Sequence, residues 1–460
     1  MSRIPLLALV GLALLSGCVR RMPEPTPQDI PRLEQAVEAR PGDVQALTRL
    51  GIAYFKAGDH PTAQAILDRA LTTGQAPGAA YLYKGLVSEE LEDWAGAREA
   101  YASYVERGEY GPLKEEIQDR LTLMVRRELR ARARETLARE EEIAQRDPRP
   151  GTVAVFPFRL TGESEELEPL QVALADMMTT DLALSGGLTV LERTRVQALL
   201  EEMALQEAGL TAPETGARAG RLLQAQHVVQ GALTPLPDRV LRFDTDVLAT
   251  RERESRGEAS AQDQLSRIFD VEKEAVFQIL DILAVDLTPA EREAINENRS
   301  ANLLAFLAYG RGLMAMDRGD YDQARQLFGE SLDADPAFGP ALEGRTEAEA
   351  LQDAALTSTD QVASRATPEL AALTSLPLPV ESPGSLAELA TGTSSLLWSM
   401  THEVVPSPSI LLVDPAGILS DALADVQHRD PLQEAIGLEG VTIPDIGIIR
   451  ITIPRPGGEN

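Results

Sequence analysis

The chain has 460 residues, of which 43% are hydrophobic, and this is enough for two or three domains with cores of their own. Its formal net charge of −29 argues against nucleic acid or an anionic lipid surface as a binding partner. The single cysteine, Cys18, excludes a disulfide within the chain.

The first 18 residues have the pattern of a targeting segment, with Arg3 followed by an apolar stretch over residues 4–15. That stretch is shorter than the roughly 20 residues that span a bilayer. The ending Leu15-Ser16-Gly17-Cys18 resembles the lipobox of bacterial lipoproteins, in which the cysteine becomes the lipidated first residue. We therefore expect a signal peptide over residues 1–17, lipidation of Cys18, and a tether over residues 18–29. This resemblance implies an outer-membrane lipoprotein that faces the periplasm.

Residues 30–110 show a helical pattern with a repeat. Gly51 and Gly85 lie 34 positions apart, as do Ala63 and Ala97. This period looks like that of tetratricopeptide repeats, whose paired helices need small residues where they pack closely. A further copy is expected over residues 299–355. The positions that match the pattern are Gly51, Tyr54, Ala63, Gly85, Ala97, Gly312, Ala324, Phe328 and Pro336.

Apolar residues recur every four positions from Leu113 to Leu137, which predicts an amphipathic linker helix within residues 111–147. Its arginines alternate with glutamates at spacings that allow pairs four residues apart. We interpret the arginine-rich part as a solvated helix face rather than a site for an anionic partner. Asp147-Pro148-Arg149-Pro150 ends the helix.

Residues 151–288 alternate between strand and helix patterns. Apolar, β-branched or alternating runs predict strands at residues 153–158, 188–193, 226–233 and 239–251. Amphipathic runs predict helices at residues 167–184, 194–207 and 263–284. Strands that alternate with helices of this length are typical of an α/β layer whose sheet is at least partly covered by helices.

Three stretches of this domain, at residues 153–158, 188–205 and 222–233, resemble the core of the CsgG family of curli-secretion lipoproteins. In that family a strand ending in Leu-Glu-Arg leads into a helix, and a Leu-Leu-x-Ala stretch precedes a strand ending in Gly. The residues that carry these features here are Leu191, Glu192, Arg193 and Gly231. The resemblance implies the α/β fold, a periplasmic setting, and structural or interfacial roles for these residues.

The secretion channel of that family also has membrane-spanning hairpins, and each strand of such a hairpin takes about 9–11 residues. Between Leu233 and Gln264 we expect only a turn, one alternating strand and the charged stretch 251–256. The sequence therefore predicts no lipid-facing hairpin.

Residues 356–460 are rich in Ser, Thr, Pro and Ala, and we expect them to be largely disordered. Residues 410–413 and 446–453 are candidate short strands. The predicted architecture is thus a multidomain α+β protein. Helical tetratricopeptide hairpins flank a central, three-layer-like α/β domain of the CsgG type, and a low-complexity C-terminal region follows.

The sequence contains no motif for catalysis, cofactor binding or metal binding. Gly186-Gly187 leads into a predicted strand rather than a helix, which does not suit phosphate binding. No nucleophile elbow is present. The histidines have no partner three or four residues away, so no metal site is predicted; they are His60, His227, His402 and His428. We predict a non-enzymatic protein without catalytic, cofactor or metal residues.

Two functional hypotheses follow from these features. The first is an assembly or secretion accessory or scaffold, held to the membrane by its lipid, which recruits envelope partners through its repeats and self-associates through its central domain. The second is a lipoprotein that activates or senses a periplasmic cell-wall synthesis enzyme. A tether of about nine proline-rich residues is short for crossing the periplasm, which counts against the second. An oligomeric secretion channel would require the hairpins that are not predicted.

Overall fold

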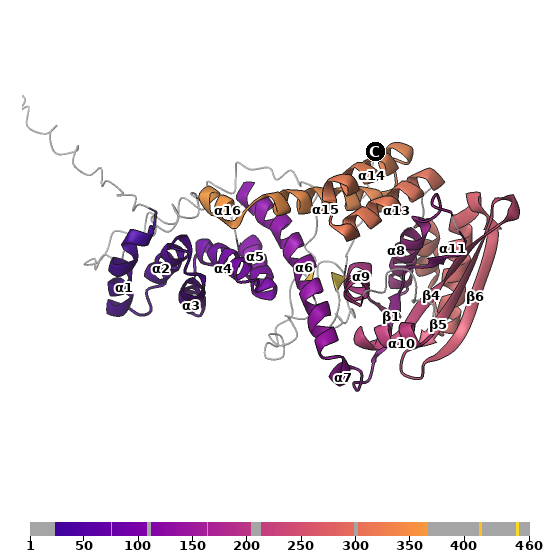
Figure 1. Cartoon of the computed structure of the whole chain (residues 1–460), viewed down its shortest axis with the longest axis horizontal. Helices are drawn as coiled ribbons and strands as arrows, with labels where there is room; N and C mark the ends of the chain where they lie inside the picture. The colour runs from indigo at the N-terminus through magenta and orange to yellow at the C-terminus, as the bar shows by residue number, and fades with distance from the viewer. Residues whose placement is uncertain are drawn as a thin grey trace, which may run out of the picture. The chain divides into compact units, whose positions relative to one another are not determined.

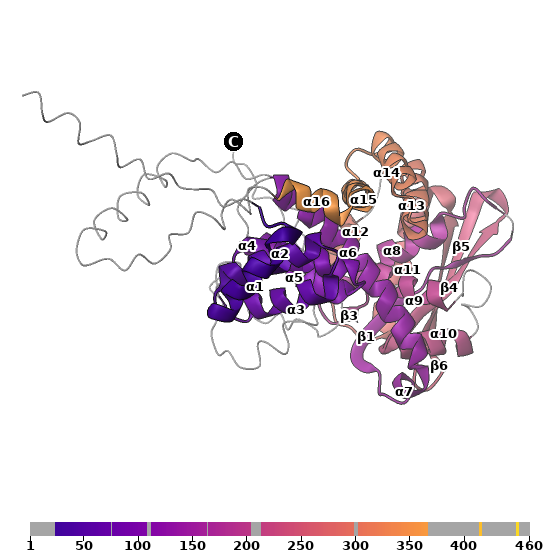
Figure 2. The ribbon, with the colours of Figure 1, turned by 60° about the vertical axis from the view of Figure 1, so that its left-hand side comes forward.

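A computed structural model shows the chain as two compact units (Figures 1 and 2). The N-terminal unit is Met1–Met124 with Ala354–Ser407, and the central unit is Val125–Asp353 with Pro408–Asn460. The structure describes residues 24–74, 76–107, 112–162, 164–203, 213–298 and 302–366, and the residue pairs 414–415 and 448–449. The predicted signal peptide, residues 1–17, and Cys18 lie outside the described residues.

Helices follow one another through the N-terminal unit. They are the 3-10 helix η1 (Pro27–Asp29), α1 (Ile30–Ala39), α2 (Val44–Lys56), α3 (His60–Leu71), α4 (Gly78–Glu90), α5 (Trp94–Arg107) and the first part of α6 (Pro112–Ala138). Aspartates begin α2 and α3: Asp43 accepts a hydrogen bond from the N–H of Ala46 at 3.0 Å, and Asp59 accepts one from the N–H of Thr62 at 3.2 Å. The result is two helical hairpins, α2 with α3 and α4 with α5.

One more helix of this unit, α16 (Thr359–Arg365), lies in the region predicted to be largely disordered. Neighbouring residues determine where this helix begins, because Ser358 and Gln361 form a reciprocal capping box. Val362 is fully buried. Farther along, β7 (Asp414–Pro415) pairs with β8 (Ile448–Ile449), which falls inside the candidate strand 446–453. The candidate strand 410–413 lies outside the described residues.

The central unit contains a mixed sheet. Its strands are β1 (Arg149–Val155), β2 (Arg159–Leu160), β3 (Thr189–Val190), β4 (Ala225–Leu236), β5 (Val240–Ala249) and β6 (Glu254–Gln264). The order is β3-β1-β4-β5-β6, and β2 also pairs with β4. The β1 strand is parallel to β3 and β4, whereas β4, β5 and β6 form an antiparallel meander.

Helices complete the central unit (Figure 1). They are α7 (Glu140–Ile143), α8 (Leu170–Ala183), α9 (Arg193–Glu202), α10 (Pro213–Leu222), η2 (Pro237–Arg239), η3 (Leu265–Arg267), α11 (Ile268–Ile282), α12 (Pro289–Glu297), α13 (Leu303–Arg318), α14 (Tyr321–Ala334) and α15 (Gly339–Leu356). The second part of α6 precedes them along the chain.

Helices cover both faces of the sheet. Val196 of α9 and Ala217 of α10 pack with Ala154 and Val228, whose side chains point to one face. On the other face, α11 packs against β5 and β6, and Phe158 meets Phe243 edge to face at 4.6 Å between ring centroids. The predicted fold class, a helix-covered α/β sheet with helical repeats in the same chain, is confirmed.

The β6 strand differs from the sequence-based expectation. Residues 251–256 were expected as a charged stretch and Asp263 as the start of a helix, whereas β6 runs to Gln264 and α11 begins at Ile268. Its only buried apolar side chains are Ala259 and Ala261, so the strand pattern is weak. Pairing with β5 along the whole strand decides its structure.

The β5–β6 pair is therefore a long hairpin that the sequence analysis did not find. Its outward residues on β6 are polar, since Glu258, Ser260 and Gln262 are exposed. Such a face does not suit contact with lipid. Among the helices described, none has the length and apolar character needed to cross a membrane.

Candidate functional site

The glycines of the repeat pattern lie where two helices of a hairpin touch. An added Cβ at Gly85 would lie 2.2 Å from the ring of Tyr101, which real contacts do not allow. Equivalent close approaches pair Gly51 with Leu67 and Gly312 with Phe328. The alanines of the pattern, Ala63, Ala97 and Ala324, are fully buried. These residues pack hairpins and leave the remaining helix surfaces to bind other groups.

Two other positions of the pattern have different surroundings. Tyr54 donates a hydrogen bond to Glu34 Oε1 at 2.5 Å, and this bond raises the pKa of Tyr54 to about 12. Pro336 is exposed between α14 and α15. Neither residue lies in the tight contacts that the glycines make.

The segment Leu191-Glu192-Arg193 was expected at the end of a strand, but it lies outside β3. Strand β3 ends at Val190, although the N–H of Leu191 still donates to the carbonyl of Val153 at 2.8 Å. Glu192 has extended backbone and is the N-cap of α9, which begins at Arg193. The turn from sheet to helix therefore lies within these three residues.

Arg193 is buried, with 6% of its surface exposed, and its guanidinium contacts two carboxylates. Its Nη1 and Nη2 donate to Asp317 Oδ2 and Oδ1 at 2.8 and 3.0 Å, which is a bidentate pair. Its Nε lies 3.3 Å from Asp176 Oδ1. Burial by itself lowers the pKa of Arg193, but Asp317 and Asp176 outweigh that effect and raise it. The guanidinium stays charged and fully engaged with the protein.

The carboxylates around Arg193 are themselves held in place. Tyr309 donates a hydrogen bond to Asp176 Oδ2 at 2.6 Å, and Arg130 donates to the backbone carbonyl of Asp317 at 3.3 Å. These residues come from α6, α8, α9 and α13. Arg193 therefore joins the sheet domain to α13 within the central unit.

Gly231 lies in the middle of β4, opposite Thr245 of β5. An added Cβ would lie 2.2 Å from the backbone carbonyl oxygen of Asp244 and 2.9 Å from Thr245 Cα. The close approach of two backbones, rather than a positive φ, requires glycine here.

A second buried charge cluster lies between α8 and α11. Lys273 contacts Asp181, and its Nζ lies 3.0 Å from Glu272 Oε2. Asn298 also donates to Asp181 Oδ1 at 2.6 Å. Glu272 is fully buried, and its ion pair with Lys273 is not aligned as a hydrogen bond. Burial, and next the charge of Asp181, raise the pKa of Glu272 well above its ordinary value of 4.5.

Stability should therefore depend on pH through Glu272. The folded state holds a proton there that the unfolded state releases above about pH 4.5, so stability is lost as pH rises above that value. We expect Glu272→Gln to raise the free energy of unfolding at pH 8 by about 1 kcal/mol or more and to flatten the pH profile. Urea unfolding between pH 4 and 8 measures this, with exposed Glu274→Gln as control. A profile as steep as that of the wild type would contradict the prediction.

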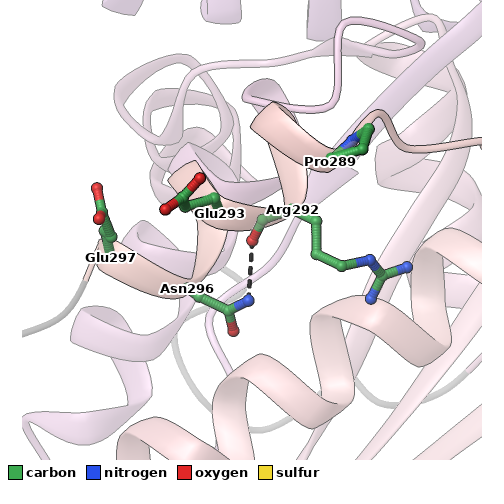
Figure 3. A pocket seen from close by; sticks show the side chains of 5 residues that line it. All are labelled: Pro289, Arg292, Glu293, Asn296 and Glu297. Carbon is green, nitrogen blue, oxygen red and sulfur yellow. Dashed lines mark hydrogen bonds between the residues drawn. The ribbon is translucent and has the colours of Figure 1, made fainter.

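A surface depression on α12 brings no convergent groups together. It is lined by Pro289, Arg292, Glu293, Asn296 and Glu297, all on α12 (Figure 3). The charged ends of these side chains point apart, and Asn296 donates to the carbonyl of Arg292 at 2.9 Å. Arg292 instead lies over the ring of Phe277, 4.6 Å from its centroid.

Histidines and acidic residues do not assemble a metal site in the described ranges. His227 lies in β4 as a half-buried strand residue whose Nδ1 has no hydrogen-bond partner. Burial, with a smaller contribution from Arg256, lowers the pKa of His227. Its surroundings are those of a packed side chain.

The comparisons with known protein families agree with this geometry. Residues 136–243 match the family described as curli production assembly/transport component CsgG. The chain contains a CsgG domain. Residues 30–80 and 48–112 match a tetratricopeptide repeat family, so the resemblances to the CsgG family and to N-terminal tetratricopeptide repeats are confirmed. The match does not reach residues 299–355, and the repeat expected there stays a prediction. A comparison with curated proteins finds no significant match.

A comparison with solved structures finds matches that include the two given next. One is the LpoB C-terminal domain from Salmonella enterica, at 13% identity and a TM-score of 0.19, covering 27% of this chain and 92% of that one. The other is yeast Tom70, at 14% identity and a TM-score of 0.22, covering 72% of this chain and 65% of that one. Such scores do not establish a common overall fold.

The CsgG match ends at residue 243, so it includes Arg193 and Gly231 but stops within β5. The remainder of β5, β6 and α11 complete the sheet and its cover. CsgG and tetratricopeptide families are accessory or scaffold domains rather than catalytic ones. The chain thus combines two kinds of protein-interaction domain.

Proposed function

We propose that this chain is a non-enzymatic lipoprotein of the outer membrane that faces the periplasm and acts as an assembly or secretion scaffold. In this proposal Cys18 carries the lipid, the repeats recruit envelope partners, and the CsgG domain provides the body to which they are attached. The CsgG match and the repeats support the accessory role, and the Leu15–Cys18 segment supports the anchor.

The observation that carries the scaffold role is the environment of Arg193. This residue belongs to the segment most specific to the CsgG family. Its guanidinium forms ion pairs with Asp317 of α13 and Asp176 of α8. The segment therefore holds a repeat helix against the domain instead of facing a substrate. A domain that holds a helical repeat is suited to present that repeat to a partner.

Membrane attachment is tested by replacing the cysteine. We expect Cys18→Ser to move the protein from the outer-membrane fraction to the soluble periplasmic fraction, because no acyl chain can then be attached. Fractionation followed by immunoblotting measures this. Ser16→Ala, which keeps a small residue before the cysteine, serves as control and should stay with the membrane. If Cys18→Ser remained in the outer-membrane fraction, the anchoring part of the proposal would be lost.

Self-association of the CsgG domain is the other part of the proposal. Light scattering on the chain beginning at residue 19 measures its absolute mass in solution. A mass of several chains would support an assembly platform. A mass near one chain would contradict self-association, leave the repeats as the interaction surfaces, and favour a tethered activator over a platform.

A further inference from the structure

Helix α16 packs on the surface that α4 and the first part of α6 form in the N-terminal unit, and we call this contact surface the groove. It packs against α4 (Figures 1 and 2). Arg365 at its end pairs with Glu116 of α6 at 2.8 Å. The side chains of Val362 and Ala366 are fully buried. The groove is thus filled by a segment of the same chain that lies more than 200 positions later in the sequence.

Two side chains of the N-terminal unit, Tyr83 of α4 and Arg120 of α6, hold the backbone of this segment. Arg120 Nη1 donates to the carbonyl of Thr357 at 2.8 Å, and Tyr83 donates to the carbonyl of Ala363 at 3.4 Å. Backbone carbonyls are present in every peptide, so these contacts do not depend on the sequence of the segment. Side-chain donors that bind backbone carbonyls in this way can also hold a peptide from another protein.

Arg120 is oriented for this contact by a buried partner. Its Nε and Nη2 donate to Glu89 at 2.7 and 2.9 Å, and Tyr101 donates to the same carboxylate at 3.1 Å. Only 3% of Arg120 is exposed. A buried ion pair gives little net stability after desolvation, so its effect here is to fix the direction in which the remaining N–H points.

Side-chain contacts add selectivity to the backbone contacts. The hydroxyl of Thr359 donates to Glu90, Val362 fills the apolar part of the groove, and Arg365 pairs with Glu116. The groove therefore selects a short helical segment with a hydroxyl at its first position, an apolar residue at its fourth and an arginine at its seventh. The carboxylate of Glu116 favours a cation at the seventh position.

The attachment is also weak enough to be reversible. Helix α16 has seven residues, and an isolated helix shorter than about 12–15 residues is marginal in water. Val362 is its only fully buried apolar side chain larger than alanine, and the other buried residues of the segment are Thr359, Ala363 and Ala366. A competing segment with the same pattern needs to replace only this small contact.

We propose that α16 is a built-in ligand of the N-terminal repeats, which closes their groove until a partner segment of the same pattern displaces it. This inference rests on the proposed role of the repeats in recruiting partners. It adds that the groove is closed in the resting chain and that the partner presents a short helix with a hydroxyl, an apolar residue and an arginine at matching positions.

Competition with a peptide tests the proposal in the full chain. The probe is a fluorescent peptide of residues 356–366, and its binding is followed by anisotropy. In the double variant Val362→Asp/Arg365→Glu the internal segment no longer fits the groove, so we expect the peptide to bind at least tenfold tighter than it binds the wild type. The same peptide with aspartate in place of Val362 should not bind.

Further variants show by peptide binding whether α16 acts as a displaceable ligand or as a fixed part of the fold. Arg325→Glu removes a similarly exposed ion pair elsewhere and should leave peptide binding at the wild-type level. Arg365→Glu alone should bind the peptide more tightly than the wild type, and adding Glu116→Arg should reverse that gain by restoring the internal pair with opposite signs.

Equal peptide binding by the wild type and the double variant would overturn the proposal. So would loss of hydrogen-exchange protection in α4 and α6 of the double variant, because α16 would then be needed to fold the repeats. Neither result depends on the membrane. A failed fractionation test would therefore leave this inference intact. A failed peptide-binding test would likewise leave the proposed membrane anchor intact.

Discussion

Replacing Arg193 with alanine is expected to lower the free energy of unfolding of the central unit by about 3–5 kcal/mol. The change removes the cation and leaves Asp317 and Asp176 together in a largely buried place, where 11% and 24% of their side chains are exposed. Two carboxylates without their partner also repel each other. Urea unfolding followed by circular dichroism measures the loss.

Arg193→Lys should fall between alanine and the wild type, because an ammonium cannot form the two parallel hydrogen bonds that Arg193 makes with Asp317. The matched control is Arg325→Ala, which removes an exposed pair with Asp322 and should change stability by no more than about 0.5 kcal/mol. A loss below about 1 kcal/mol for Arg193→Ala would show that α13 does not depend on this contact.

Valine at Gly231 is expected to cost about 3 kcal/mol of stability, the upper part of the usual range for overpacking. The atoms that its Cβ would meet are backbone atoms of β5, Asp244 O at 2.2 Å and Thr245 Cα at 2.9 Å. Backbone cannot rotate away as a side chain can, so β4 and β5 would have to separate. Thermal and urea unfolding both measure the effect.

Gly329→Ala is the control for this prediction. Gly329 lies inside α14, and nothing lies within 4 Å of an added Cβ. Alanine there should stabilise the chain by about 0.5–1 kcal/mol, because it lowers the entropy of the unfolded state and favours helix. If both substitutions changed the free energy of unfolding in the same direction, the distinction between a packed and an open glycine would be wrong.

The sequence gives the same information about Arg193 and Gly231. Gly231 and Arg193 were both identified by resemblance to the CsgG family, which indicates that they are structural or interfacial. The resemblance does not name their partners. The 2.2 Å approach at Gly231 and the pairing of Arg193 with Asp317 come from how strands and helices meet in space.

Local patterns predicted most helices and the buried strands because each depends on neighbours within a few residues. The 34-residue period identified the N-terminal hairpins, and the apolar run before Phe156 identified β1. Strand β6 was missed because only Ala259 and Ala261 face the core and its residues favour no strand by themselves. Its pairing with β5 overrides that weak preference.

By itself the sequence determined the two domain types, the targeting pattern at Cys18 and the absence of any recognisable catalytic motif, since all of these depend on residue identity and spacing. The tertiary structure decided which charges are buried together. Asp317 lies 124 positions from Arg193, and Asp181 lies 92 positions from Lys273. It also decided that α16 fills the repeat groove. Contacts between residues so far apart leave no period in a sequence, because folding alone brings them within hydrogen-bonding distance.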